Sequence, residues 1–404
     1  MLRNSLTFFS LLIYFQFFAQ TPSIKFEEYT LENGLQVILH ENHTTPIVAV
    51  SVMYHVGSKN EKPNRTGFAH FFEHLLFEGS KNIKRGEFFK YIENAGGQNN
   101  ANTSNDRTFY YEVLPSNQLE LGLWLESERL LHANINQDGI DTQNEVVKEE
   151  KRLRVDNQPY GSFFAEINKR AFKEHPYKWT TIGEMEHLDA ATLDEFIDFY
   201  HKFYVPENAI LSIAGDIDVL ATKKLINAYF GSIPNGGNNI EKVSIVEPPL
   251  EGEIRDTIYD DVQLPGVMMA YRAPEQGSKD FYAIEMMSKV LSDGESSRLN
   301  KTCVEKSQSA MYCGSFPFPS EDPGLSFVYS IANSGVNPLD LEKEINNELN
   351  LLQTSLVSDK EMQKIRNMIE NDFVGNFTSM IGIAENLANY KMYFGDAKES
   401  IAKL

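Results

Sequence analysis

The pattern of hydrophobic and polar positions predicts a chain in which helices and strands are mixed from end to end. Short alternating or aromatic stretches predict strands, and longer amphipathic stretches predict helices. In the first half we expect strands within residues 27–42 (two short strands around an Asn-Gly turn), 46–58 and 208–217, and an aromatic strand that follows a polar loop within 98–115. We expect helices within residues 67–79, 86–96, 117–134, 138–157 and 192–204.

The order of elements then restarts. Residues 231–253 have the Pro, Gly and Asn content of an interdomain connector. Beyond it we expect a strand at 266–274, a helix at 279–293, a second helix, a strand at 324–332 and a helix at 338–353. The sequence therefore predicts an α+β fold of two homologous domains, each with a mixed or antiparallel sheet covered by helices on one face.

The expected domain boundaries follow from this repeat. The first domain covers residues 20–232, the linker 233–252 and the second domain 253–404. The helix and strand that close the first unit have no counterpart before Leu404. We therefore expect the second domain to be incomplete at its C-terminal end.

The N-terminal residues have the proportions of a secretory signal peptide. Arg3 precedes an apolar run from Leu6 to Phe18, and Ala19 is a small residue suited to cleavage. The run is short for a spanning helix, although an uncleaved membrane anchor is the alternative. We expect residues 1–19 to be the signal peptide and the mature protein to be exported, periplasmic or secreted, with no stable membrane insertion.

The composition and net charge of the chain argue against some classes of partner. The chain has 404 residues, 42% of them hydrophobic, and a formal net charge of −20. Phosphate binding needs clustered Lys and Arg, so this charge argues against nucleic acid as a partner. It suits either a solvated acidic surface or a cavity that attracts cationic segments. The two cysteines, Cys303 and Cys313, match no zinc motif and are not candidates for catalysis; the sequence leaves open whether they are bonded.

The strongest candidate chemistry lies within the apolar stretch 67–79. His70 and His74 are four residues apart, so they share one face of a helix, and Glu73 lies beside them. Two such imidazoles can bind one zinc ion, and the glutamate can then take a proton from an attacking water. The alternative is that both histidines are hydrogen-bonded core residues.

A third ligand is expected from the helix within residues 138–157. Its apolar positions include Val146, Val147 and Leu153, and Glu150 falls in the middle of that stripe. A carboxylate on an apolar face is typical of a metal ligand on a buried helix. Glu149 falls near the edge of the stripe and is the second choice.

The order His70-x-x-Glu73-His74, with 75 residues between His74 and Glu150, resembles the pitrilysin/insulinase family of zinc metallopeptidases. It is most similar to the short two-domain branch that includes mitochondrial processing peptidase. The likeness continues in residues 99–113, 144–161, 175–188 and 202–216. It implies one zinc ion per chain, bound by His70, His74 and Glu150, with Glu73 as general base.

The resemblance also implies a substrate site and shows two departures. Asn100 and Ala101 match a pair that precedes an edge strand, where substrate is expected to add as a further strand. Many members have a second acidic residue seven positions before the third ligand, and here that position is Gln143.

The second departure lies in the second domain. The family's substrate-binding Arg and Tyr follow a Ser-Arg-Leu signature, here residues 297–299, and their positions fall at Val304 and Met311. Tyr312 is one residue away from the expected Tyr position. We therefore expect a homologous partner subunit to supply the Arg and Tyr, with a homodimer as the alternative.

The sequence thus predicts a zinc endopeptidase subunit that acts on peptides or unfolded segments. The main alternative is a non-catalytic scaffold or peptide-binding subunit of the same family. Such proteins tend to lose motif residues, whereas this chain retains all four. Metal storage is a weaker alternative, because the chain has no His- or Cys-rich tract.

Overall fold

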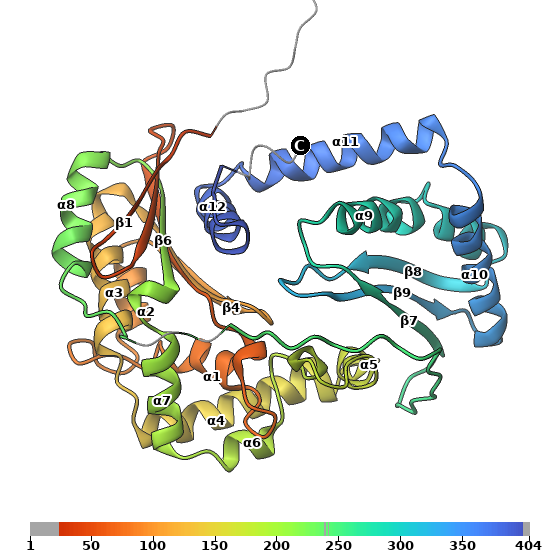
Figure 1. Ribbon diagram of the computed structural model, residues 1–404, viewed down its shortest axis with the longest axis horizontal. Helices are drawn as coiled ribbons and strands as arrows, with labels where there is room; N and C mark the ends of the chain where they lie inside the picture. Colours follow the sequence, from red (N-terminus) through yellow and green to blue (C-terminus); the bar gives the residue numbers. More distant parts are fainter. Residues whose placement is uncertain (1–23, 238–239, 241, 399–404) are drawn as a thin grey trace, which may run out of the picture.

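The computed structural model describes residues 24–237, 240 and 242–398 (Figure 1). The expected signal peptide, residues 1–19, lies outside the described residues and stays a prediction. The expected domain boundaries, at residues 232/233 and 252/253, also stay a prediction. Within the described part of the chain, no helix is both long and apolar enough to cross a membrane.

The first sheet is mixed and has six strands in the order β1-β2-β6-β3-β5-β4. Neighbouring strands are antiparallel except β2 and β6, which are parallel. Strand β6 therefore lies between β2 and β3, although these two strands come from the start of the chain. The strands are β1 Glu27–Thr30, β2 Gln36–Glu41, β3 Ile47–Tyr54, β4 Gln98–Thr103, β5 Thr108–Pro115 and β6 Ala209–Gly215.

The second sheet is antiparallel and has three strands in the order β7-β9-β8. They are β7 Gly266–Ala273, β8 Ala310–Pro317 and β9 Gly324–Ala332. The sequence did not predict β8. Cys303 and Cys313 lie buried in the core of this domain as free thiols. Two sheets with their own helices confirm the predicted α+β class.

Twelve α-helices are described. The helix α7 begins as the sequence predicts, because Thr192 and Glu195 form a capping box at its first turn. The helices are α1 Phe68–Leu75, α2 Phe88–Asn94, α3 Leu119–His132, α4 Gln137–Lys151, α5 Phe163–Ala171, α6 Met185–Asp189, α7 Leu193–Phe203, α8 Val219–Phe230, α9 Lys279–Ser292, α10 Pro338–Thr354, α11 Asp359–Asn376 and α12 Met380–Phe394.

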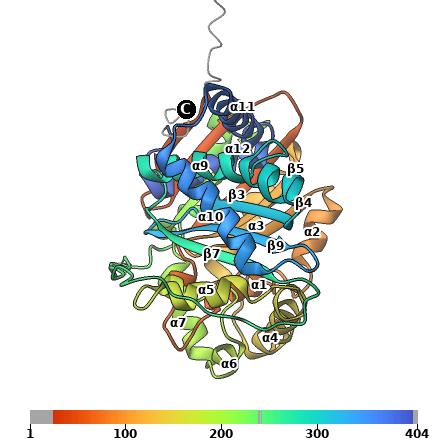
Figure 2. The same ribbon diagram turned by 90° about the vertical axis from the view of Figure 1, so that its right-hand side faces the viewer.

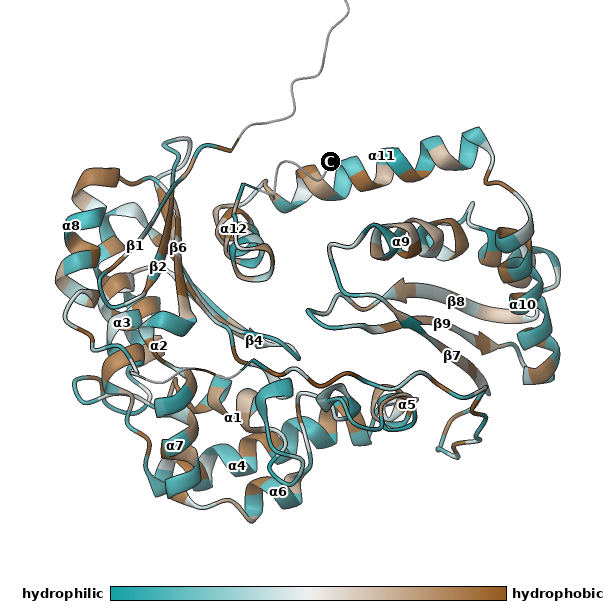
Figure 3. Cartoon of the chain, viewed as in Figure 1, coloured by the Kyte–Doolittle hydropathy of each residue, from teal (hydrophilic) through white to brown (hydrophobic). Residues whose placement is uncertain are grey.

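One face of the first sheet and helices α1, α3, α7 and α8 enclose the main hydrophobic core. Alternate residues of β3, Val48, Val50 and Val52, point into it. Phe72 of α1 and Phe196 of α7 pack there without solvent exposure. Burying each such side chain stabilises the fold by roughly 1.5–3 kcal/mol. Figure 3 shows the resulting apolar strands at the centre of this domain.

Each sheet is covered on its second face by a helix from the other half of the chain, a feature that the sequence did not predict. Leu387 of α12 packs in one cluster with Met53 and Phe109 of the first sheet. Phe163 of α5 packs against Phe327 of the second sheet (Figures 1 and 2). The two halves therefore contact each other directly through α12 and α5, in addition to being joined by the linker.

A buried ion cluster fixes the same interface. The ammonium of Lys59, which follows β3, lies 2.9 Å from Asp106 and 3.3 Å from Asp322, and also pairs with Glu321. Asp322 and Glu321 lie in the turn between β8 and β9. Burial alone would lower the pKa of Lys59, but the three carboxylates outweigh it and raise the pKa. Asp106 lies in the turn after β4, so the cluster joins that turn to the second domain.

Candidate metal centre

Helix α1 is short and carries both candidate histidines on a strongly apolar segment. Phe68, Phe71 and Phe72 are buried in the main core. The chain enters the helix through Gly67, whose φ is +91°. Gly is required there, because an added Cβ would lie 2.7 Å from the carbonyl oxygen of Ile182 in a backbone conformation that L residues rarely adopt.

Buried charges hold both ends of α1. The carboxylate of Glu61 accepts hydrogen bonds of 2.9 Å from the backbone N–H groups of Gly67 and Ala69. The guanidinium of Arg129 donates to the carbonyl of Leu76 at 3.1 Å, just after the last helical residue. The oxygens of Glu61 satisfy N–H groups of the first turn, although burial raises the pKa of this carboxyl group, and the positive Arg129 complements the helix dipole at the C-terminus. The helix is therefore fixed in position at both ends.

Arg129 belongs to a fully buried charge cluster. Its guanidinium lies 3.1 Å from Glu126 and 3.6 Å from Glu112, and it stacks on the rings of Phe77 and Tyr110. Burial and then the neighbouring Glu126 raise the pKa of Glu112. One guanidinium thus faces two carboxyl groups, of which Glu112 is driven toward its neutral form.

We expect Arg129→Met to lower the free energy of unfolding by about 3–5 kcal/mol, because it leaves buried carboxyl groups without their cation. The matched control is Arg65→Met, which breaks the partly exposed pair with Glu195 and should cost about 0–1 kcal/mol. Urea denaturation of both variants checks this. Equal stability of the two variants would contradict the assigned role of Arg129.

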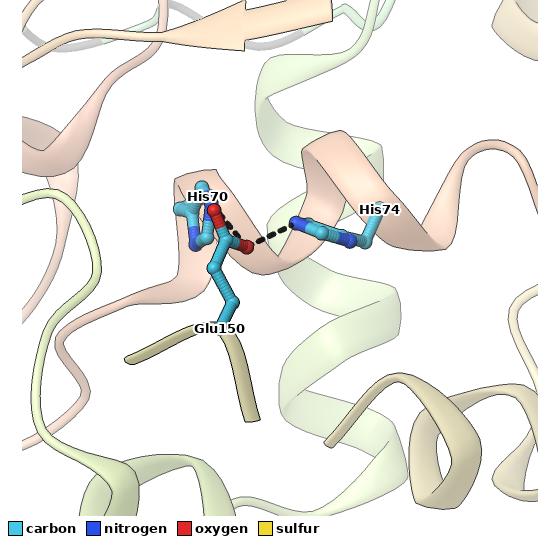
Figure 4. Close-up of side chains that lie close together, drawn as sticks. All are labelled: His70, His74 and Glu150. Atoms are coloured by element: carbon cyan, nitrogen blue, oxygen red, sulfur yellow. Dashed lines mark ion pairs between the residues drawn. The ribbon is translucent and has the colours of Figure 1, made fainter. Parts of the chain in front are cut away.

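Helix α4 brings Glu150 to the two histidines (Figure 4). Glu150 Oε2 lies 3.1 Å from His74 Nε2 and 3.5 Å from His70 Nε2. One ligand atom from each of the three residues lies within 4.8 Å of the others. Tetrahedral zinc with ligand distances of about 2.0–2.1 Å places neighbouring ligand atoms roughly 3.3 Å apart. The three side chains therefore fit one zinc ion with little rearrangement.

The protonation states and unmet contacts also suit a metal. Burial and then His74 lower the pKa of His70 to about 4, so its ring is neutral and can donate a lone pair. The hydrogen bond with His74 lowers the pKa of Glu150 against the effect of burial. Among the described residues, the buried His70 Nδ1 has no hydrogen-bond partner, and Glu150 Oε2 has only the two imidazole contacts given above. Glu150 Oε1 is 2.9 Å from the exposed Arg154.

The structure distinguishes between Glu150 and Glu149 as candidates for the third ligand. Glu149 is exposed and pairs with Arg152 at 2.6 Å, away from the histidines. The apolar stripe that led to this choice is only partly real, because Val147 is buried while Val146 and Leu153 are exposed. After Lys151 the chain widens into a π-helix, Arg152–Asp156, so the expected helix 138–157 is not α-helical throughout.

Glu73 lies on α1 next to His74. Thr103 Oγ1 donates a hydrogen bond of 2.6 Å to Glu73 Oε2. Burial raises the pKa of Glu73, and this hydrogen bond opposes the shift. A partly buried carboxylate beside the metal ligands is suited to accept a proton from water. The sequence did not single out Thr103.

Asn100 and Ala101 lie within β4, the edge strand of the first sheet. The expectation of a polar loop at this point, with the pair ahead of an edge strand, is therefore wrong. Ala101 packs against the main core, whereas Asn100 is exposed and its Oδ1 accepts a hydrogen bond of 2.9 Å from the Ala101 N–H. Polar residues are tolerated in this strand because it lies at the edge of the sheet.

The carboxylate of Glu78 lies next to Gln143. Gln143 Nε2 donates a hydrogen bond of 2.5 Å to Glu78 Oε1, and Glu78 also pairs with Arg85. Glu78 follows α1 closely, four residues after His74. A carboxylate therefore lies against this position although the residue itself is neutral.

In the second domain, Val304 lies in a π-helix, Asn300–Lys306. Met311 is the extra residue of a bulge in β8, where the pairing shifts between Ala310 and Tyr312. Both irregularities change the spacing of side chains relative to regular elements. Tyr312 is exposed, and its hydroxyl lies 3.3 Å from that of Tyr329. Tyr312 thus has an exposed hydroxyl one residue from the expected Tyr position, whereas Val304 has no guanidinium at the expected Arg position.

Comparison with protein families gives two matches along the chain. A model described as insulinase (peptidase family M16) matches residues 36–184, and one described as the peptidase M16 inactive domain matches residues 190–369. The zinc protease PqqE of Helicobacter pylori is 32% identical over 92% of this chain and 84% of that protein. A probable mitochondrial-processing peptidase subunit beta of Schizosaccharomyces pombe is 26% identical over 78% of this chain and 71% of that protein.

Solved structures agree with this fold. A protease from Helicobacter pylori superposes with a TM-score of 0.89 at 32% identity, over 95% of this chain and 94% of that one. The periplasmic protease PqqL from Escherichia coli has a TM-score of 0.76 at 20% identity, over 94% of this chain and 44% of that one. The second likeness concerns the fold alone.

Proposed function

Because the chain belongs to the M16 (insulinase) family of peptidases, we propose that it is a zinc-dependent endopeptidase subunit that cleaves peptides or unfolded segments. One observation carries the proposal. Two imidazole nitrogens and one carboxylate oxygen lie within 4.8 Å of one another, and Glu73 lies between the two histidines on α1. Relatives named zinc proteases support a peptidase-type function.

The roles of the residues follow from this arrangement. His70, His74 and Glu150 would hold the zinc ion. A zinc ion there would act as a Lewis acid on the scissile carbonyl. It would also lower the pKa of water, so that the water can lose a proton near neutral pH and attack. Glu73 takes a proton from the attacking water and passes it to the amine leaving group. Its partly buried site, which raises its pKa, favours both transfers.

Substrate binding is assigned to the free edge of β4. Within the part of the chain that the structure describes, this strand pairs with β5 on one side and has no strand neighbour on the other. A peptide can add there as a further strand through backbone hydrogen bonds. Asn100 and Ala101 lie in the middle of this edge. The binding mode selects for extended, unfolded segments rather than for folded surfaces.

The site needs further donors for the oxyanion that forms on the scissile carbonyl. We assign them to a homologous partner subunit, or to a second copy of this chain, because no Arg stands at Val304. One relative is itself named as a subunit beta. We further propose that the protein is exported and acts in the periplasm or outside the cell, on the basis of residues 1–19.

The experiment compares this chain alone with the chain mixed with a homologous subunit that carries the Arg and Tyr. The substrate is an internally quenched, unfolded peptide, with and without a zinc chelator. We expect strong, chelator-sensitive cleavage in the mixture. Peptide binding without cleavage in either sample would favour the scaffold alternative, which the "inactive domain" description of the second match keeps open. Full activity of the chain alone would overturn the division of labour.

A further inference from the structure

The contact between Thr103 and Glu73 joins two elements that the proposed function uses separately. Thr103 is the last residue of β4, and Glu73 lies on α1 beside the metal ligand His74. The hydroxyl donates to the carboxylate at 2.6 Å, a short distance typical of a hydrogen bond to a charged acceptor. The strand assigned to substrate thus touches the group assigned as base.

The strand geometry aims Thr103 at this contact. Side chains alternate along a strand, so Asn99, Ala101 and Thr103 share one face of β4. Ala101 on that face packs against the core that includes α1. Thr103 pairs with Thr108 across the β4–β5 ladder, and its β-branched side chain has few allowed rotamers. Its hydroxyl is therefore held toward α1 by the register of the sheet.

The turn that follows Thr103 is also fixed. The Ser104 hydroxyl accepts hydrogen bonds from the N–H groups of Asp106 at 3.2 Å and Arg107 at 3.1 Å. Arg107 pairs with Glu385 of α12 at 2.6 Å, and Asp106 pairs with the buried Lys59. Contacts from both halves of the chain thus hold the end of β4 in place. The Thr103 hydroxyl is a rigid support rather than a mobile one.

We propose that Thr103 is a positioning residue for the general base, which sets the distance between Glu73 and a substrate lying along β4. This inference rests on the proposed function. The hydroxyl of Thr103 donates to Glu73 Oε2 and so keeps the carboxylate in one rotamer. The other oxygen, Oε1, is then directed at the attacking water. Thr103 acts through Glu73 and does not touch the reacting atoms.

The test uses Thr103→Val, Thr103→Ser and Thr108→Val in the full chain, assayed with its partner if the mixture is the active form. Valine keeps the shape of Thr103 and removes the donor, while serine restores it. Loss of a hydrogen bond to a charged group costs about 1.5–3 kcal/mol, so we expect kcat to fall roughly ten- to a hundredfold in Thr103→Val. KM and zinc content should not change, and Thr103→Ser should recover most of kcat.

Thr108→Val is the matched control, because it removes a buried hydrogen bond to the carbonyl of Val56, which lies just after the neighbouring strand β3. It should lower stability and leave kcat unchanged. Crystal structures of the zinc-loaded proteins give a second readout. The Glu73 carboxylate should occupy one position in the wild type and in Thr103→Ser, and a shifted or split position in Thr103→Val.

The outcomes separate the two proposals. An active wild type with an equally active Thr103→Val variant, or a Glu73 carboxylate that does not move in that variant, overturns the role of Thr103 and leaves the peptidase intact. A fall in kcat shared by Thr103→Val and Thr108→Val would make the effect structural and also overturn it. A wild type that cleaves nothing, alone or in the mixture, overturns the proposed function first.

Discussion

Replacing Glu73 by Gln is expected to remove nearly all peptide cleavage while zinc stays bound. The carboxamide has the size of the carboxylate and still accepts a hydrogen bond from Thr103 through its oxygen, so the site keeps its shape. It cannot take a proton from the attacking water. General-base catalysis contributes roughly 10²- to 10⁴-fold, and kcat should fall by that factor. Metal analysis and cleavage of the quenched peptide, measured on the same samples, test both halves of the expectation.

The control for this variant is Glu145→Gln. It makes the same change of charge on an exposed face of α4, where Glu145 pairs with Lys148. We expect this variant to retain full activity. Undiminished cleavage by the Glu73 variant would refute the mechanism. Loss of zinc together with activity would show instead that Glu73 supports the metal site and is not simply a base.

The metal helix and most core elements could be predicted because their residues follow regular periods. The apolar segment around His70 and His74 became α1, and the alternating segment at 46–58 became β3. The period failed at β4, where neither face is apolar. Its outer residues are solvated, and the inner ones include Thr103, which faces the polar site instead of the core. The polar residues on both faces of this strand removed the alternation of apolar and polar positions by which strands are recognised.

The choice of Glu150 over Glu149 shows a different limit. The argument placed Glu150 on an apolar stripe, yet two of the three stripe residues, Val146 and Leu153, are exposed. The choice agreed with the geometry because helix periodicity puts Glu150 on the same side as the buried Val147. Periodicity therefore identified the side of α4 that faces α1, but not how far its apolar surface extends.

Apart from the contact of Glu150 with the two histidines, long-range contacts could not be predicted. The charges that hold α1, Glu61 and Arg129, look like solvent-exposed residues in the sequence, because their partners lie elsewhere in the chain and only folding buries them. The same is true of α5 and α12, each of which packs on the sheet of the other domain. An amphipathic pattern shows that a helix has a partner but not which one.

The largest effect on metal binding is expected from Glu150→Gln. A neutral carboxamide is a poor zinc ligand, and the change removes the negative charge that faces two imidazoles at 3.1 and 3.5 Å. The affinity for zinc should fall by more than the roughly 10- to 100-fold that the loss of an outer-shell partner costs. Cleavage should fall with it. Titration against a chelator of known affinity measures the first effect, and the quenched peptide measures the second.

Glu149→Gln is the matched control, because it makes the same substitution one residue away, on a side chain that is about half exposed and bound to Arg152. It should keep both zinc and activity. The reverse pattern, with zinc lost from the Glu149 variant and retained by the Glu150 variant, would mean that α4 presents its other carboxylate to the metal. In that case α4 would have to turn by about 100° relative to α1, which would expose the buried Val147.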